Sequence, residues 1–142
     1  MSDESGPISE DELLYRRIPA SSGWYAPATG LRPEAFAPHR TADETGLSVY
    51  RARFKSIEEA ERGRAGKSYY VAVLRAGDLR SHGIRIEPSP IFGDPGHAEL
   101  PDLNPAVRKQ DATINAALTL AGLVRLVEGP YATEDGDPVV HA

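Results

Sequence analysis

The stretch SYYVAVL, residues 68–74, decides the fold. It combines aromatic and β-branched residues, which fit the pleated surface of a β-sheet. Its apolar side chains follow one another without alternation, as they do in a strand that is covered on both faces. We therefore expect residues 68–74 to form a central strand around which the other elements pack.

Four other segments have strand character: 13–18 (LLYRRI), 47–54 (LSVYRARF), 84–87 (IRIE) and 97–100 (HAEL). The first of them could instead be a short helix, and Pro19 stops it in either case. Residues 47–54 alternate between apolar and polar types, which predicts a half-buried strand that carries Arg51 and Arg53 outward.

Helical signals concentrate in the last third of the chain. The Asn-Pro pair at residues 104–105 is a typical helix start, with the asparagine as the cap. Apolar residues then recur at steps of three and four to about residue 127, which predicts one long helix. Two short helical segments are expected as well, one after the capping box of Ser56 and Glu59 and one over residues 76–82.

These elements predict an α+β fold: a compact, mainly antiparallel sheet of about four to five strands with one long C-terminal helix. Residues 12–130 would form this single domain, whereas residues 1–11 would be a flexible leader and residues 131–142 a frayed tail. Residues 19–46 hold four prolines without sustained periodicity, which indicates a long ordered loop whose aromatic residues pin it to the core.

Composition narrows the possible functions. The chain has 142 residues and a net charge of −5, so a large nucleic-acid surface is not expected. Cysteine is absent, which excludes disulfides, thiolate catalysis and cysteine-ligated zinc. No apolar run approaches the roughly 18 residues of a membrane-spanning helix, and the first residues lack a signal-peptide pattern. We expect a cytoplasmic protein without a membrane partner.

The segment GDPGHAEL, residues 93–100, concentrates most of the candidate chemistry. His97 and Glu99 are two apart on an expected strand, so their side chains would share a face. They could act as a general acid and base, or they could be structural, with Glu99 paired to an arginine and His97 closing the turn. A metal site would need a third ligand, for which His39, His82 or Asp94 would be available only if the fold brought one of them close, and no metal site is predicted.

Arginine and aromatic residues supply the remaining candidates. Arg16 and Arg17 carry planar guanidinium groups that suit phosphate or carboxylate, or they could be solvated and paired with glutamates. Tyr50 and Arg51, on the next strand, could likewise either bind a ligand or have a structural role. Trp24 could stack on a base or a nicotinamide, or it could plug the core. The P-loop, dinucleotide-binding and serine-hydrolase motifs are all absent from the sequence.

The segments LYRRIP, PEAF, LSVYRARF and DPGHAEL, in that order, resemble those of a group of small uncharacterised bacterial proteins. In that group the second segment has the form S-A-A-F, from which residues 33–36 depart, and Gly96 replaces the residue usually found before the histidine. The resemblance covers residues 13–100 and implies one coherent domain without implying an activity.

The order of elements also has a likeness to ADP-ribosyltransferase-type folds. By that resemblance Arg16 or Arg17 would hold the phosphates of NAD, Tyr50 or Ser48 would line the nicotinamide pocket, and Glu99 would orient a ribose hydroxyl. The S-T-S motif of those families is missing, and residues 97–99 (HAE) do not form their E-x-E motif.

Three functional hypotheses follow. The first is an accessory or interaction protein without a cofactor, whose partner is another protein or a second copy. The alanines of the long helix would let another helix approach closely, which suits either the core or a seam between copies; they are Ala112, Ala116, Ala117 and Ala121. The second is an NAD-consuming, ADP-ribosyltransferase-like enzyme that uses an arginine of the first strand, Tyr50 or Ser48, and Glu99. The third is a small-anion binder that uses Arg16, Arg51 and His97. A transferase requires Glu99 at the floor of a cleft.

Overall fold

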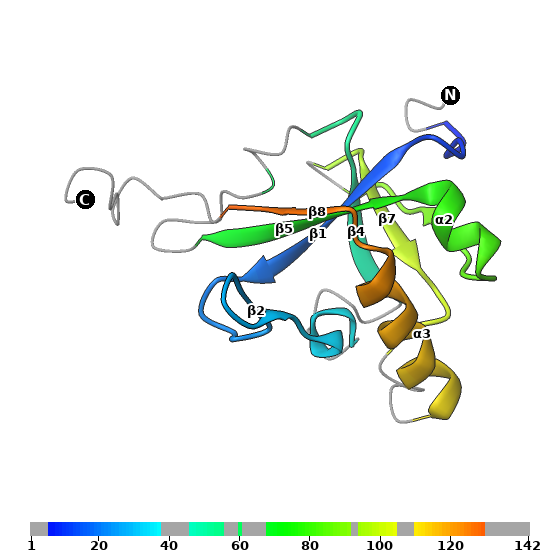
Figure 1. Ribbon diagram of the computed structural model, residues 1–142. Helices are drawn as coiled ribbons and strands as arrows, with labels where there is room; N and C mark the ends of the chain where they lie inside the picture. Colours follow the sequence, from blue (N-terminus) through cyan, green and yellow to red (C-terminus); the bar gives the residue numbers. More distant parts are fainter. Residues whose placement is uncertain are drawn as a thin grey trace, which may run out of the picture.

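The computed structural model describes residues 6–37, 46–55, 60, 68–91, 94–104 and 110–129, and its centre is a six-stranded sheet (Figure 1). Every pair of neighbouring strands is antiparallel. The strands run across the sheet in the order β6 (Glu87–Pro88), β7 (His97–Leu100), β4 (Leu47–Arg51), β1 (Leu13–Pro19), β5 (Tyr69–Arg75) and β8 (Leu126–Glu128). The α+β class and the mainly antiparallel sheet are thereby confirmed, with six strands where four to five were expected.

β1 and β5 pair along their whole length, from Leu13 opposite Arg75 to Pro19 opposite Tyr69. Residues 71–74 of β5 are buried on both faces of the sheet, as their continuous apolar character predicts. This pairing shows that residues 13–18, for which a short helix was the alternative, form a strand.

Alternation divides the sheet into two faces of different composition. The inner face carries the main core, which includes Leu14, Val49 and Leu100 and is covered by a 3₁₀ turn, η1 (Pro33–Phe36), and by the helix α3 (Asp111–Leu123). Figure 1 shows both elements on the same side of the sheet. The outer face carries a smaller apolar cluster of Tyr15, Ala60, Val71 and Val73.

The C-terminal helix is shorter than the sequence predicts. α3 begins at Asp111, after residues 105–109, which lie outside the described part of the chain, and it ends at Leu123. Val124 is extended, and residues 126–128 form β8 against β5. An apolar period of three to four cannot separate this edge strand from one more helical turn, and pairing with β5 decides in favour of the strand.

The buried stripe of α3 also differs from the expectation. Thr113, Ala117 and Leu120 are buried against the domain, whereas Ile114 and Leu118 stay about half exposed, at 47% and 52%. The helix therefore contacts the domain along a narrow stripe, and its two flanks remain open.

The long loop contains local structure. Its first half forms a hairpin of β2 (Tyr25–Ala26) and β3 (Gly30–Leu31), and η1 follows. The ring of Tyr25 packs edge-on against that of Tyr70 with centroids 4.8 Å apart, so an aromatic residue does pin this segment to the core.

The short elements follow the sequence in part. The helical turn expected over residues 76–82 is α2 (Ala76–Ser81). The strand expected over residues 84–87 is present only as β6, which begins at Glu87. Ile84 and Ile86 are buried, but they lie outside any strand. The capping box at residues 56–59 lies outside the described residues, as does the tail over 131–142.

The described part of the N-terminal segment is packed against the domain, although residues 1–11 were expected to be flexible. Ile8 is 5% exposed, and the buried guanidinium of Arg51 donates hydrogen bonds to the carbonyl oxygens of Gly6 (2.8 Å) and Pro7 (3.1 Å). Composition did not indicate this attachment, because its anchor lies more than 40 residues away in the sequence.

Candidate functional site

The outer face of the sheet brings together the residues of the proposed acid-base site. In the register of β4 and β7, Tyr50 lies opposite His97 and Ser48 lies opposite Glu99. Directly opposed residues share a face, so these four side chains lie on one side of the sheet. The rings of Tyr50 and His97 meet edge to face with centroids 5.7 Å apart.

His97 is held at both ring nitrogens. Its Nδ1 is 2.8 Å from the carbonyl oxygen of Ser89, which can only accept, so Nδ1 is the donor. In the neutral imidazole Nε2 is then an acceptor, and the hydroxyl of Ser48 donates to it at 3.0 Å. His97 is 6% exposed and Ser48 is 1% exposed. This serine-histidine pair is closed to a substrate and ties β4, β7 and Ser89 together.

Glu99 is half-buried beside this pair. Its carboxylate accepts a hydrogen bond from the Ser89 hydroxyl at 3.4 Å, and Glu87 of the edge strand lies opposite it in the register. Glu99, Tyr50 and His97 line neither of the two hollows that are described below.

Arg17 lies on the same outer face, between two tyrosines. Its guanidinium carbon is 5.0 Å from the ring centroid of Tyr50 and 5.1 Å from that of Tyr69, and its Nε donates to the carbonyl oxygen of Ala60 at 2.6 Å. The ammonium of Lys55 is also near Tyr50, at 5.2 Å from the ring centroid. Stacking of this kind holds a guanidinium in a fixed plane.

The other candidate arginines lie on the inner face and are fully buried. Arg16 donates from Nε to the carbonyl oxygen of Ala35 and from Nη1 to that of Ser48, both at 3.0 Å, so it ties η1 to β4. Arg51 donates hydrogen bonds to both carboxylate oxygens of Glu12, from Nε to Oε2 and from Nη2 to Oε1, the latter at 2.9 Å. Arg51 was expected to point outward, but it follows Leu47 and Val49 at steps of two and therefore shares their buried face.

The sequence candidates therefore do not converge on one site. Arg16 and Arg51 are on the inner face, whereas Tyr50, His97 and Glu99 are on the outer face. Trp24 is partly buried and packs against the core of the inner face. The arrangement required of a small-anion binder, with Arg16, Arg51 and His97 around one ligand, is not present.

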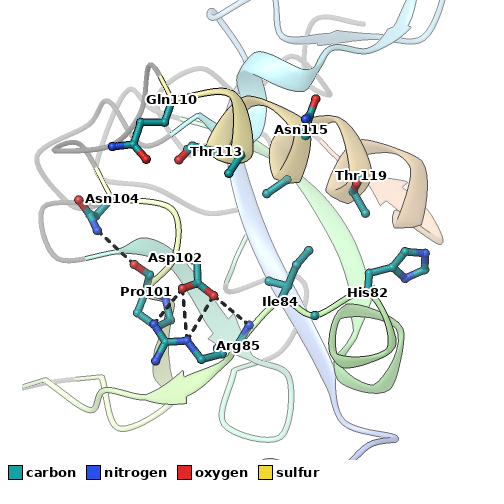
Figure 2. Close-up of a pocket in the computed structure, with 13 residues that line it drawn as sticks. His82, Ile84, Arg85, Pro101, Asp102, Asn104, Gln110, Thr113, Asn115 and Thr119 are labelled. Atoms are coloured by element: carbon teal, nitrogen blue, oxygen red, sulfur yellow. Dashed lines mark hydrogen bonds and ion pairs between the residues drawn. The ribbon is translucent and has the colours of Figure 1, made fainter.

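A hollow lies elsewhere, beside α3. It has a volume of about 610 Å³ and separates α3 from two loop segments, residues 82–85 after α2 and residues 101–104 after β7. We call it the polar groove. In Figure 2 Gln110, Thr113, Asn115 and Thr119 follow α3 along one wall, and Asp102 and Arg85 belong to the facing wall.

Two alanines form part of the α3 wall. Ala112 and Ala116 are four residues apart, as are Asn115 and Thr119, so all four side chains lie on one flank of the helix. The small alanine side chains leave room between the amide and the hydroxyl. In the sequence these alanines had indicated a helix-packing seam, whereas in the structure they line the groove.

The facing wall contains an ion pair. The guanidinium of Arg85 contacts the carboxylate of Asp102, with Nη2 and Oδ1 2.8 Å apart. The hydrogen bond from Arg85 lowers the pKa of Asp102 and raises that of Arg85. The two charges therefore compensate each other, and the groove offers mainly neutral donors and acceptors.

Thr113 is the buried polar side chain of the groove. It is 4% exposed and lines both the polar groove and the hollow on the other flank of α3. Among the described residues its hydroxyl makes no hydrogen bond. A buried hydroxyl without a partner is uncommon, so it calls for a physical explanation.

The opposite flank of α3 is mainly apolar, with Glu34 and Thr113 as the polar residues of its lining. A hollow of about 310 Å³ lies between α3 and η1, and Pro33, Ala37, Ile114, Ala117 and Leu118 contribute to its lining. We call it the apolar hollow. Ile114 and Leu118 are one helical turn apart and about half exposed at its rim.

Sequence reasoning missed both hollows, because asparagine, glutamine and threonine scattered over two segments form no motif. The available signal was the i, i+4 spacing of the apolar residues Ile114 and Leu118 on the expected helix, but the spacing does not show that they stay about half exposed.

Comparisons of the chain with protein-family models, with curated proteins and with solved structures found no match. Within the described ranges, no three His, Asp or Glu side chains gather as a metal site would require. No helix in that part of the chain is long and apolar enough to span a membrane.

Proposed function

We propose that this chain is a small interaction protein that docks a polypeptide partner on α3. The observation that carries the proposal is the pair Ile114 and Leu118, which stand about half exposed beside the apolar hollow. Exposed apolar side chains next to a hollow are typical of sites at which proteins meet. Docking would remove the exposed half of both side chains from water, which contributes on the order of 1 kcal/mol for each.

The shape of this flank also supports a second copy of the chain as a partner. A protruding apolar ridge and a hollow lie side by side on one surface, so a two-fold axis beside α3 could seat each ridge in the hollow of the other copy. A different protein that presents its own apolar side chain would satisfy the same surface.

The NAD-dependent alternative receives less support from the geometry. Arg17, Tyr50 and Glu99 share the outer face, but the serine-histidine pair beside them is buried, and Arg16 is engaged inside the core. We therefore do not propose transferase activity.

The test uses two matched variants. Leu118→Asp places a charge at the rim of the apolar hollow, whereas Ile91→Asp changes an equally exposed residue that lines neither hollow. Sedimentation equilibrium from micromolar to millimolar concentration measures self-association, and selection from a displayed library of random twelve-residue peptides finds other partners.

Association or peptide binding that Leu118→Asp abolishes and Ile91→Asp preserves is the expected result. A chain that stays monomeric and enriches no peptide dependent on Leu118 contradicts the proposal.

A further inference from the structure

We infer that the polar groove is a binding site for an extended, uncharged polypeptide segment, which it recognises through the main chain. This inference goes beyond the proposed function, because it concerns the opposite flank of α3 and assigns a different ligand chemistry to it.

The donors and acceptors of the groove match a peptide backbone. A side-chain amide offers both an N–H and a carbonyl oxygen, as the peptide group does, and Gln110 and Asn115 each bring one to the groove. The hydroxyls of Thr113 and Thr119 can donate or accept. Gln110 is the N-cap residue of α3, yet its side chain makes no capping hydrogen bond, so its amide remains available at the mouth of the groove.

Thr113 is the second, independent observation. Its side chain is buried, it lines the groove, and its hydroxyl has no hydrogen-bond partner among the described residues. Folding alone gives no reason to bury a hydroxyl there, because valine has the same shape without the polar atom. A ligand group that pairs with this hydroxyl supplies the reason.

The charges and the lining exclude other ligand classes. Arg85, the cationic residue of the lining, is paired with Asp102, so a phosphate or carboxylate would have to compete with that pair. Among the described lining residues none is Tyr, Trp or Phe, and the imidazole of His82 is tied through Nδ1 to the carbonyl oxygen of Asp78 at 3.0 Å, so the lining does not favour the stacking of a nucleobase. A neutral, hydrogen-bonding ligand remains.

The length of the groove fits a short extended segment. From Gln110 to Thr119 the helix rises about 13 Å at 1.5 Å per residue. An extended chain advances about 3.3 Å per residue, so about four residues span the wall. Along such a chain alternate N–H groups point to the same side, which gives the binding mode a period of two.

The test starts from a displayed library of random six-residue peptides without Asp, Glu, Lys or Arg. Peptides enriched on the wild-type chain are synthesised with blocked ends and titrated calorimetrically into Thr113→Val, Asn115→Ala and Ile114→Ala. Each peptide is also made with a single N-methyl group at successive positions, because N-methylation removes one main-chain donor and leaves the side chains unchanged.

We expect Thr113→Val and Asn115→Ala to weaken binding by up to about tenfold each, the effect of one hydrogen bond, while Ile114→Ala on the other flank preserves it. N-methylation should weaken binding at alternate positions. Thr113→Val should also raise the melting temperature of the unliganded chain, so a loss of binding through unfolding is distinguishable.

Three results would overturn the inference. They are the enrichment of no peptide, binding that is insensitive to N-methylation at every position, and binding that Ile114→Ala removes but Asn115→Ala does not. The last of these would leave the proposed function standing on the apolar hollow. Binding that depends on Asn115 and is indifferent to Leu118→Asp would identify the groove as a site separate from the apolar hollow, and the proposed function would then depend on its own test.

Discussion

The hydroxyl of Ser48 lies 3.0 Å from Nε2 of His97, and together they form a polar link between two adjacent strands of the sheet. Because Nδ1 of His97 donates to the carbonyl oxygen of Ser89, the neutral imidazole keeps Nε2 as an acceptor. The pair resembles a catalytic serine and its base in chemistry, but its burial gives it a structural role.

Replacement of Ser48 by alanine tests that role. Ser48→Ala leaves a buried acceptor on His97 without its donor, and we expect the free energy of unfolding to fall by about 1–3 kcal/mol, measured by urea denaturation. A Ser48→Ala variant as stable as the wild type would mean that the hydrogen bond between Ser48 and His97 does not stabilise the fold.

Glu12 should be required for the attachment of the N-terminal segment. Its side chain is 6% exposed and Arg51 is fully buried, so Glu12→Ala leaves a buried cation without its counter-charge. Loss of one partner of a buried pair costs about 3–5 kcal/mol, and limited proteolysis should then cut near residue 10.

The matched control for that variant is Arg32→Ala. Arg32 and Glu34 form an ion pair with side chains 62% and 50% exposed, and exposed pairs contribute little. We expect Arg32→Ala to change the stability by less than about 0.5 kcal/mol. Equal effects of Glu12→Ala and Arg32→Ala in denaturation would contradict the structural role of Arg51.

Two glycines should respond to alanine in opposite directions. A Cβ atom at Gly96 would lie 2.5 Å from Cβ of Phe54, so Gly96→Ala should destabilise the fold by about 1–3 kcal/mol. A Cβ atom at Gly122 of α3 would meet no atom within 4 Å, so Gly122→Ala should stabilise it by about 0.5–1 kcal/mol. Thermal unfolding of both variants gives the signs, and a stable Gly96→Ala would show that β7 and Phe54 are not in close contact.

Asp78 should contribute to acid sensitivity. The hydrogen bond from Arg125 is the main cause that holds the pKa of Asp78 below its ordinary value of 3.8, and Arg75 adds to the effect. The folded state therefore binds this proton more weakly than the unfolded state does. The stabilisation is complete above the ordinary pKa and is lost as the pH falls from there through the lowered value.

Melting temperatures recorded from neutral pH down to about pH 2 check this prediction. The curve of Asp78→Asn should decline less steeply below pH 4 than that of the wild type. Parallel curves would show that Asp78 does not titrate with folding.

The strands were the most predictable part of the fold. Strands form within the segments expected over residues 13–18, 68–74 and 97–100, because local propensity and burial agree there. The strand expected over residues 47–54 ends at Arg51. β8 was assigned to the helix because Leu126 and Val127 fit both periods, and only pairing with β5 separates them.

The candidate surfaces were less predictable, for a physical reason. Adjacent residues on a strand point to opposite faces, so Arg16 and Arg17 have separate environments although they are neighbours in the sequence. The sharing of one face by His97 and Glu99 followed directly from their spacing. The polar groove could not be predicted, because it depends on how α3 stands relative to residues 82–85 and 101–104.

The central claim is that the open flanks of α3 serve to bind a partner and do not stabilise the fold. The melting temperature of Thr113→Val tests this claim most directly. Valine and threonine have similar helix propensities, so the change removes a buried hydroxyl and little else. We predict a rise of about 2–4 °C, because an unsatisfied polar group is replaced by an apolar one. A fall of similar size would show that the hydroxyl is already paired within the folded chain, and it would contradict the account.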